Sequence, residues 1–194
     1  RTVYRDVADL QAQGVPIEGE AGVGYRLGKG FDLPPLMFTA DEARALAMAT
    51  RIAQQWLDPA LALAAGDAMS RVLSVLPSGM RTEVDRMPLV VPPVGLSPAV
   101  GAALQSLREA SQSRTVLEIG YLDLNERRST RRVRPLGCYF WGKVWTLATW
   151  CEWRQDFRSF RVDRIEHIRL LPERFADEPG RTLADLLRRE CELD

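Results

Sequence analysis

The stretch RRVRPLGCYFWGKVWTLATWCEWRQDFRSFRVDRI, residues 131–165, decides the fold of the C-terminal half. Apolar and polar residues alternate in short runs within it and just before it, a pattern typical of half-buried strands. Gly142 and Lys143 suit a tight turn between two strands. Short strands at such close spacing predict a small curled sheet or barrel. The expected strands are 116–121, 131–135, 137–140, 144–151, 158–161 and a closing segment over 164–171.

Helical patterns precede and follow this sheet. Thr39 and Glu42 form a capping box, in which each side chain satisfies a backbone N–H of the other residue. The pairs Asp58–Pro59 and Ser97–Pro98 each supply an N-cap and a first helical residue. These signals predict helices over 39–57, 59–76, 78–86 and 98–112, and a C-terminal helix within 182–191.

The N-terminal residues carry a third pattern. Apolar residues at helical spacing predict a helix over residues 1–13. Two short apolar runs, 15–17 and 25–27, are separated by glycines and predict a small β-hairpin. The run GKGFDLPPLMF, residues 28–38, holds two Gly and two Pro and predicts a linker.

Composition limits the possible functions. The 194 residues hold 26 Lys plus Arg and 26 Asp plus Glu, which excludes a globally basic polymer-binder but not a local basic face. Three Cys without a CxxC pair disfavour a disulfide framework and a zinc ribbon, and suit a reducing compartment. A single His disfavours a catalytic triad and a His-based metal site, and we expect no cofactor. No apolar run reaches the length of a membrane span. Because the chain opens at Arg1 without Met, we expect its native N-terminus to be missing.

The N-terminal helix and hairpin are candidates for DNA contact. Arg1, Thr2, Tyr4 and Arg5 lie on the polar side of the predicted helix. Arg bonds guanine edges or phosphates, and Thr and Tyr commonly bond phosphates. Arg26, on the hairpin, is placed for the adjacent DNA backbone. Charge pattern alone favours the alternative, an ordinary surface helix.

This segment resembles a known DNA-binding motif. In RTVYRDVADLQAQGVPIEGEAGVGYRL, residues 1–27, the run Arg-Thr-Val-x-Arg-Asp-Val is followed by Gly-Val-Pro-Ile and then by Gly-x-Gly-Tyr-x-Leu. This order and separation are similar to the recognition helix and wing of the DeoR-type winged helix-turn-helix found in bacterial transcriptional regulators. The resemblance implies that Arg1, Thr2, Tyr4 and Arg5 face DNA. Since the helices that precede the recognition helix in that motif are absent from this chain, we expect a partial motif.

Residues 126–169 form an arginine-rich stretch within this neutral chain, with eleven Lys or Arg against five Asp or Glu. Four of the five tryptophans lie between 141 and 153. Arginines interleaved with aromatic residues on a small barrel suit phosphates and stacked bases. The alternative is that the aromatic residues form the core and the arginines are solvated, and Trp150 and Phe160 fit the core better.

The same stretch resembles the WYL domain. That family shows an Arg-x-x-x-Pro-x-Gly-Leu segment, a Trp-Tyr-Leu strand and an Arg-x-Phe-(Arg/Lys)-(Leu/Val)-Asp-Arg-Ile segment. Residues 131–138 match the first segment, with Cys138 in place of Leu. Residues 145–147 match the strand, except that Thr146 replaces Tyr. Residues 158–165 match the last segment in full.

The resemblance spans residues 95–172 and implies a helix followed by an Sm-like, five-stranded barrel that senses an effector. The polar residues of the family line a pocket or groove proposed to bind a nucleic-acid-derived or other anionic ligand, single-stranded DNA among them. Guanidinium groups bind phosphate oxygens in pairs, and aromatic faces stack on bases. We expect Asp163 to orient an arginine by a salt bridge. The effector-binding candidates by motif position are Trp145, Arg158, Phe160, Arg161 and Arg164, and by strand neighbourhood Arg134 and Tyr121.

The sequence thus predicts an α+β protein that is a cytoplasmic bacterial transcriptional regulator. It would bind double-stranded DNA as a homodimer and sense a nucleotide, single-stranded nucleic acid or other anionic effector. The alternative is a direct single-stranded nucleic-acid-binding module without an allosteric role. Since no triad, metal cluster or phosphate loop is recognisable, we do not expect an enzyme. The predicted parts are a partial winged helix-turn-helix (1–28), a linker (29–38), a helical segment (39–94), a WYL domain with an Sm-like or SH3-like β-barrel (95–172) and a C-terminal helix (173–194).

Overall fold

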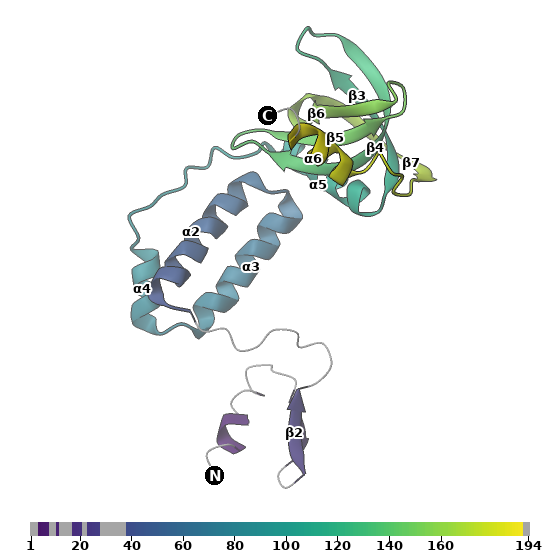
Figure 1. The fold of residues 1–194 in the computed structure, drawn as a ribbon. Coiled ribbons are helices and arrows are strands. Elements are labelled where there is room, and N and C mark those ends of the chain that lie inside the picture. The colour runs from purple at the N-terminus through teal and green to yellow at the C-terminus, as the bar shows by residue number, and fades with distance from the viewer. Residues whose placement is uncertain (1–3, 8–10, 12–16, 21–22, 28–37, 192–194) are drawn as a thin grey trace. The chain divides into compact units, whose positions relative to one another are not determined.

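The computed structural model describes residues 4–7, 11, 17–20, 23–27 and 38–191. The chain forms two compact units, Arg1–Thr39 and Ala40–Asp194 (Figure 1). Of the helix predicted over residues 1–13, only residues 4–7 and 11 are among the described residues. Of the predicted linker, only residue 38 is.

The first unit contains a helical turn and a β-hairpin. Residues 4–7 are helical. Strands β1 (Ile17–Glu20) and β2 (Gly24–Leu27) pair antiparallel, with Glu18 opposite Arg26. This pairing is the hairpin that the glycine-separated apolar runs predict.

The second unit begins with a helical segment. Its helices are α2 (Ala40–Trp56), α3 (Pro59–Val75) and α4 (Ser78–Asp85). α2 and α3 lie side by side (Figure 1), and their bounds agree with the predicted helices to within a residue. The Asp58 carboxylate accepts a hydrogen bond of 3.2 Å from the N–H of Leu61, as an N-cap should. The segment packs around buried Ala43, Ala47, Met69, Leu76 and Val84.

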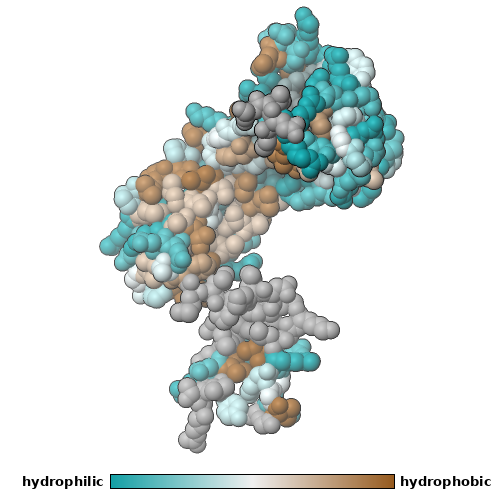
Figure 2. Space-filling model, viewed as in Figure 1, coloured by the Kyte–Doolittle hydropathy of each residue, from teal (hydrophilic) through white to brown (hydrophobic). Residues whose placement is uncertain are grey.

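The helical segment leaves much apolar surface uncovered. α3 consists largely of Ala, Leu and Val, but Met69 is the one residue within its bounds that is buried. Leu63 is 67% exposed and Val75 is 68% exposed. Figure 2 shows apolar residues gathered over this segment. Exposed apolar patches of this kind are typical of surfaces that contact other proteins.

The rest of the second unit is a five-stranded antiparallel sheet in the order β6-β5-β4-β3-β7. The strands are β3 (Thr115–Leu122), β4 (Arg128–Phe140), β5 (Trp145–Cys151), β6 (Asp156–Arg161) and β7 (Ile165–Arg174). A single 3-10 turn, η1 (Val162–Arg164), joins the edge strands β6 and β7, and the sheet curls on itself (Figure 1). A helix followed by a meander whose last strand returns beside its first is the order of small Sm-like barrels. The predicted α+β fold class is confirmed.

Helix α5 (Pro98–Gln112) closes the core of this curled sheet. Its N-cap is Ser97, whose hydroxyl accepts a hydrogen bond from the N–H of Val100. Because Leu104, Leu107 and Ala110 recur at helical spacing, one face of α5 is apolar and packs on the inner face of the sheet. The sheet contributes Leu117, Ile119, Val133, Leu147, Cys151 and Phe160 to this core.

The two strands expected over 131–135 and 137–140 are in fact one strand, β4. Its pairing with β5 shifts register between Pro135 and Gly137, which marks a β-bulge. Since Pro135 has no N–H to donate, the ladder is interrupted there and the alternation of side chains changes phase. The sequence signal that resembled a break between strands is this bulge.

Helix α6 (Leu183–Cys191) covers the outer face of the sheet. Leu186 packs there with Ala148, Trp150 and Phe157. Trp150 is therefore a core residue, as the alternative interpretation of the aromatic residues predicted. Within the described ranges, no helix is both long and apolar enough to cross a membrane.

Candidate effector site and nucleic-acid interface

The described DNA-contact candidates lie in the first unit. Tyr4 is 50% exposed, and Arg5 is exposed as well. The ring of Tyr4 meets the ring of Tyr25 edge-on, with 6.2 Å between the ring centroids. The guanidinium of Arg26 donates two hydrogen bonds, of 3.0 and 2.7 Å, to Glu18 across the hairpin. A DNA phosphate must therefore compete with Glu18 for Arg26. Arg1 and Thr2 lie outside the described residues.

Strand β6 and turn η1 bring two candidate arginines together with an acid. Arg161 donates from Nε and Nη2 to the two carboxylate oxygens of Asp163, at 3.0 and 2.7 Å. These hydrogen bonds outweigh burial and hold the pKa of Asp163 below its ordinary value. Asp163 thus orients Arg161 and occupies the guanidinium donors that could otherwise bind an anion.

Arg164 and Tyr121 complete what we term the 161–164 cluster, defined as Tyr121, Arg161, Asp163 and Arg164. Arg164 donates from Nη1 to the backbone oxygen of Asp123 at 2.8 Å. The ring of Tyr121 meets that of Phe160 edge-on, with centroids 4.9 Å apart. Phe160 is 6% exposed and belongs to the barrel core, so it supports Tyr121 from inside.

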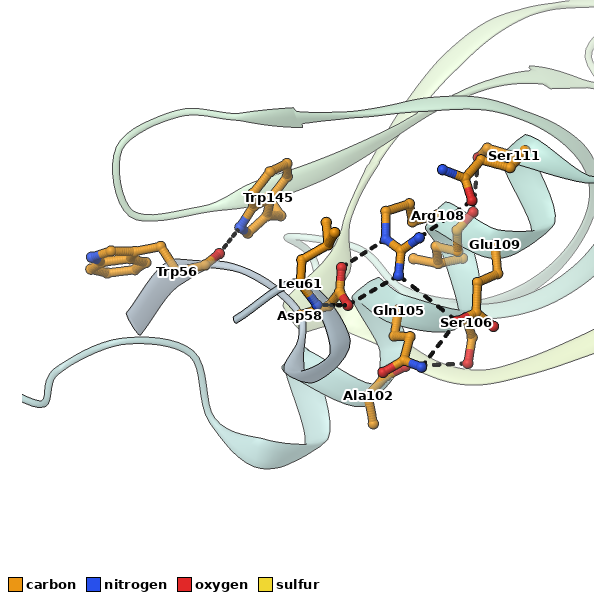
Figure 3. Close-up of polar contacts among 12 residues, drawn as sticks. Trp56, Asp58, Leu61, Ala102, Gln105, Ser106, Arg108, Glu109, Ser111 and Trp145 are labelled. Atoms are coloured by element: carbon orange, nitrogen blue, oxygen red, sulfur yellow. Dashed lines mark hydrogen bonds and ion pairs between the residues drawn. The ribbon is translucent and has the colours of Figure 1, made fainter. Parts of the chain in front are cut away.

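Trp145 lies where the barrel meets the end of α2. Its indole N–H donates to the backbone oxygen of Trp56 at 2.7 Å (Figure 3). A groove of about 230 Å³ opens beside it, and we term it the Trp145 groove. Because Asp163 lines the groove as well, the groove borders the 161–164 cluster. Its lining comprises Trp56, Val94, Gly95, Leu96, Ser97, Val100, Lys143, Val144, Trp145 and Asp163.

A buried ion pair holds the same junction. Arg108 donates from Nε and Nη2 to the two carboxylate oxygens of Asp58, at 2.8 and 3.1 Å, and Asp58 is 1% exposed. Burial alone raises the pKa of Asp58, but hydrogen bonds from Arg108 and from the backbone of Leu61 outweigh it, so the pKa lies below its ordinary value. Figure 3 shows this pair linking the start of α3 to α5. Sequence reasoning identified Asp58 only as an N-cap, because no local pattern connects residues this far apart.

The remaining candidates lie elsewhere on the barrel. Arg158 is exposed and donates to Asp156 at 3.0 Å, beside α6. Arg134 is bound to Glu152 at 3.2 Å and to Glu178 at 2.6 Å, and its side chain is only 20% exposed. The predicted effector residues therefore fall in three places, and the Trp145 groove with the 161–164 cluster is the place that combines most of them.

The groups at this place offer hydrogen bonds, positive charge and aromatic surface to an anion. Lys143 is exposed at the rim of the groove.

Cys138 does not line the groove. Burial raises the pKa of its thiol to about 11, so this thiol stays protonated near neutral pH. Over the described part of the chain, His, Cys, Asp and Glu form no group of three or more that could hold a metal ion.

Comparison with known protein families matches two separate segments of the chain. Residues 102–170 match the family model of the WYL domain, and residues 1–26 match that of an HTH domain. The chain thus contains a WYL domain and a helix-turn-helix segment. The predicted resemblance to the WYL domain is confirmed, the N-terminal resemblance is confirmed as a helix-turn-helix domain, and its DeoR type stays a prediction.

The chain is similar to a curated protein by sequence and to a solved structure by fold comparison. Protein PafB of Mycobacterium leprae (strain TN) is 30% identical over 180 residues, which cover 85% of this chain and 51% of PafB. The chain therefore spans about half the length of this curated relative. The solved proteasome accessory factor B/C (PafBC) of Arthrobacter aurescens is 21% identical, with a TM-score of 0.40, over 80% of this chain and 25% of that one. At this level of similarity, the solved structure adds nothing to the fold described above.

Proposed function

We propose that this chain belongs to a bacterial, cytoplasmic DNA-binding transcriptional regulator whose WYL domain senses an anionic effector. The observation that carries the proposal is the presence of both a helix-turn-helix match and a WYL match on one chain. The exposed Tyr4 and Arg5 support a DNA-facing helix of DeoR type, together with Arg1, Thr2 and Arg26. We expect no catalytic activity.

The effector would bind in the Trp145 groove against the 161–164 cluster. Lys143 and Arg161 supply positive charge there, and Trp145 supplies aromatic surface. A phosphate that replaces Asp163 on Arg161 keeps both hydrogen bonds of the guanidinium fork. A nucleotide or single-stranded nucleic acid carries both the phosphate and the stacking base that these groups suit.

The position of the groove favours coupling to the rest of the protein. It is lined by Trp56 of α2 and by Lys143 and Trp145 of the barrel, so a ligand there contacts both parts of the second unit. A ligand that binds one arrangement of these parts more tightly than another shifts the population toward it.

The regulator would act as a homodimer. Helix-turn-helix proteins commonly bind two operator half-sites through two-fold symmetry. α2 and α3 expose apolar side chains, among them Leu46, Ile52 and Leu63, and this apolar surface suits contact with a second copy.

Duplex selection tests the DNA-binding half of the proposal. The chain would be used to enrich binding sites from a randomised duplex library, and the affinity for the enriched duplex would be measured by fluorescence anisotropy. Arg5→Ala should lower that affinity by tenfold or more (about 1.4 kcal/mol), because each lost phosphate or base contact is worth about 1–3 kcal/mol. Arg81→Ala, which removes an exposed arginine from α4, should leave it unchanged. Equal affinity of Arg5→Ala and the unaltered chain for the enriched duplex, or equal loss in both variants, would contradict the proposal.

A further inference from the structure

The turn between β5 and β6 carries an exposed aromatic residue outside the groove. Trp153 follows the end of β5 and is 62% exposed. Its ring is in contact with two arginines. The Cζ atom of Arg131, on β4, lies 4.0 Å from the ring centroid, and that of Arg154 lies 4.6 Å from it. Both distances are within the range of cation–π attraction.

In the part of the chain that the structure describes, neither guanidinium group of this cluster is neutralised by an acid. A guanidinium that stacks face to face on an aromatic ring keeps its N–H donors pointing outward in its own plane. Arg131 makes a hydrogen bond of 3.3 Å to the backbone oxygen of Thr130. Among the described residues, no carboxylate forms an ion pair with Arg131 or Arg154. Each arginine therefore has donors available for an anion.

The acidic residues at the two ends of the turn are already occupied. Glu152 binds Arg132 at 2.6 Å and Arg134 at 3.2 Å. Asp156 binds Arg158 at 3.0 Å and Arg189 at 2.7 Å. Neither acid is therefore left to neutralise Arg131 or Arg154. Among the described residues, the cluster of Arg131, Trp153 and Arg154 thus carries an uncompensated positive charge.

The turn is held in one conformation. Gln155 has a φ of 49°, in the left-handed region, and its backbone N–H donates to the oxygen of Cys151 at 2.8 Å. Its side-chain amide donates to the oxygen of Glu152 at 2.7 Å. Trp153 and Arg154 are thus placed before any ligand arrives, which lowers the entropic cost of binding.

We propose that Arg131, Trp153 and Arg154 form a second nucleic-acid contact, which binds the phosphates of a single strand. The cluster stands on open surface, so a chain that passes over it fits better than an enclosed small molecule. Unpaired bases can stack on the outer faces of the guanidinium planes, whereas the bases of a duplex cannot reach them. The inference rests on the proposed effector class, and extends it from one groove to a strand that also contacts the β5–β6 turn.

The test measures binding of a fluorescently labelled oligo-dT to the full chain by anisotropy at several salt concentrations. The double variant Arg131→Gln/Arg154→Gln should weaken binding by tenfold or more. On a single strand, each phosphate contact makes the plot of log K against log salt steeper by about 0.7. Since the double variant loses two contacts, its plot should be less steep by about 1.4. The matched control is the double variant Arg128→Gln/Arg169→Gln, which also removes two positive charges from the sheet, but from arginines already paired with Glu166 at 3.1 Å and with Glu118 at 2.6 Å. It should change the affinity by less than twofold.

Other arms separate the source of the phosphate and the role of the ring. If inorganic triphosphate or a mononucleotide displaces the oligo-dT at equal phosphate concentration, free phosphate compounds rather than a strand are the ligand, and the proposal is wrong. Trp153→Leu should weaken binding severalfold, since the guanidinium planes lose their support, and Trp153→Phe should restore it.

The outcomes distinguish this inference from the proposed function. If Arg161→Gln/Arg164→Gln abolishes oligo-dT binding while Arg131→Gln/Arg154→Gln does not weaken it, the second contact is disproved and the groove stands. If only Arg131→Gln/Arg154→Gln weakens binding, the second contact is supported and the groove is disproved as the binding site of the strand. Absence of oligo-dT binding by the unaltered chain would overturn the second contact.

Discussion

At the residue scale, the ion pair between Arg161 and Asp163 is the contact that the proposed anionic effector would have to open. The two hydrogen bonds of 3.0 and 2.7 Å occupy the guanidinium fork that a phosphate would use. Asp163 therefore supports Arg161 and, in the proposed function, would compete with the effector for it.

Replacement of Asp163 is predicted to raise the affinity for an anionic effector rather than to lower it. Asp163→Asn removes a negative charge beside the groove and weakens the internal competitor, so the affinity for an anionic effector should rise about three- to tenfold, which corresponds to about 0.7–1.4 kcal/mol. Isothermal titration with a nucleotide would measure it, and Glu166→Gln, another acid of the same strand region, serves as the control. A loss of affinity in Asp163→Asn would show that orientation of Arg161 matters more than competition.

The buried Asp58–Arg108 pair makes a stability prediction. Removing one partner of a buried pair costs about 3–5 kcal/mol, and Asn keeps the N-cap acceptor, so Asp58→Asn should cost about 2–3 kcal/mol in urea unfolding at pH 7. Arg114→Gln breaks an exposed pair with Asp177 and should cost about 0–1 kcal/mol. Similar losses in both variants would contradict this reading of the junction.

The pH dependence of stability follows from the same residue. Because the pKa of Asp58 is lower in the folded chain than its ordinary value of 3.8, the unfolded chain binds the proton more readily. The stabilisation is thus complete well above pH 4 and is lost as the pH falls through the folded pKa. The acid side of the stability profile should be flatter in Asp58→Asn than in the unaltered chain.

At the element scale, the junction between the helical segment and the barrel depends on close backbone approach. The N–H of Leu96 donates to the oxygen of Gln55 at 2.8 Å. A Cβ on the neighbouring Gly95 would lie 1.9 Å from that same oxygen, so only glycine fits there.

Substitution of this glycine tests the junction. Gly95→Ala should destabilise the chain by about 1–3 kcal/mol through forced displacement of the α2 end, and should reshape the Trp145 groove. Gly79→Ala, in α4, is the matched control because no atom lies within 4 Å of the added Cβ. Thermal unfolding compares the two, and equal melting temperatures would count against the junction.

Periodicity and caps predicted the elements well, because helices and strands are set by local pattern. The N-cap pairs at Asp58 and Ser97 placed the starts of α3 and α5 correctly. The sequence predicts a break between strands at Pro135 where the structure has a bulge, because both features change the phase of the apolar alternation. The Asp58–Arg108 pair could not be predicted, because no local pattern connects residues so far apart in the sequence. For the same reason, the sequence did not reveal that Arg134, Arg158 and Arg161 lie in separate places.

At the scale of the whole molecule, net charge conceals the distribution of charge. The chain has equal numbers of basic and acidic residues, and most arginines of the barrel are held in ion pairs with Asp or Glu. We therefore expect an anion to bind where an arginine can exchange its partner or lacks one, and the 161–164 cluster and the β5–β6 turn are the two such places that we propose.

The most direct test of the proposed effector sensing is a titration of tryptophan fluorescence, since Trp56 and Trp145 line the groove. Single-stranded DNA and mono-, di- and cyclic nucleotides would be added to the unaltered chain, to Arg161→Gln/Arg164→Gln and to Arg169→Gln, which breaks a pair with Glu118 on the barrel surface. We predict saturable binding that is weakened at least tenfold in the first variant and unchanged in the second. Binding unaffected by loss of Arg161 and Arg164, or no binding of any anion, would contradict an effector site in the Trp145 groove.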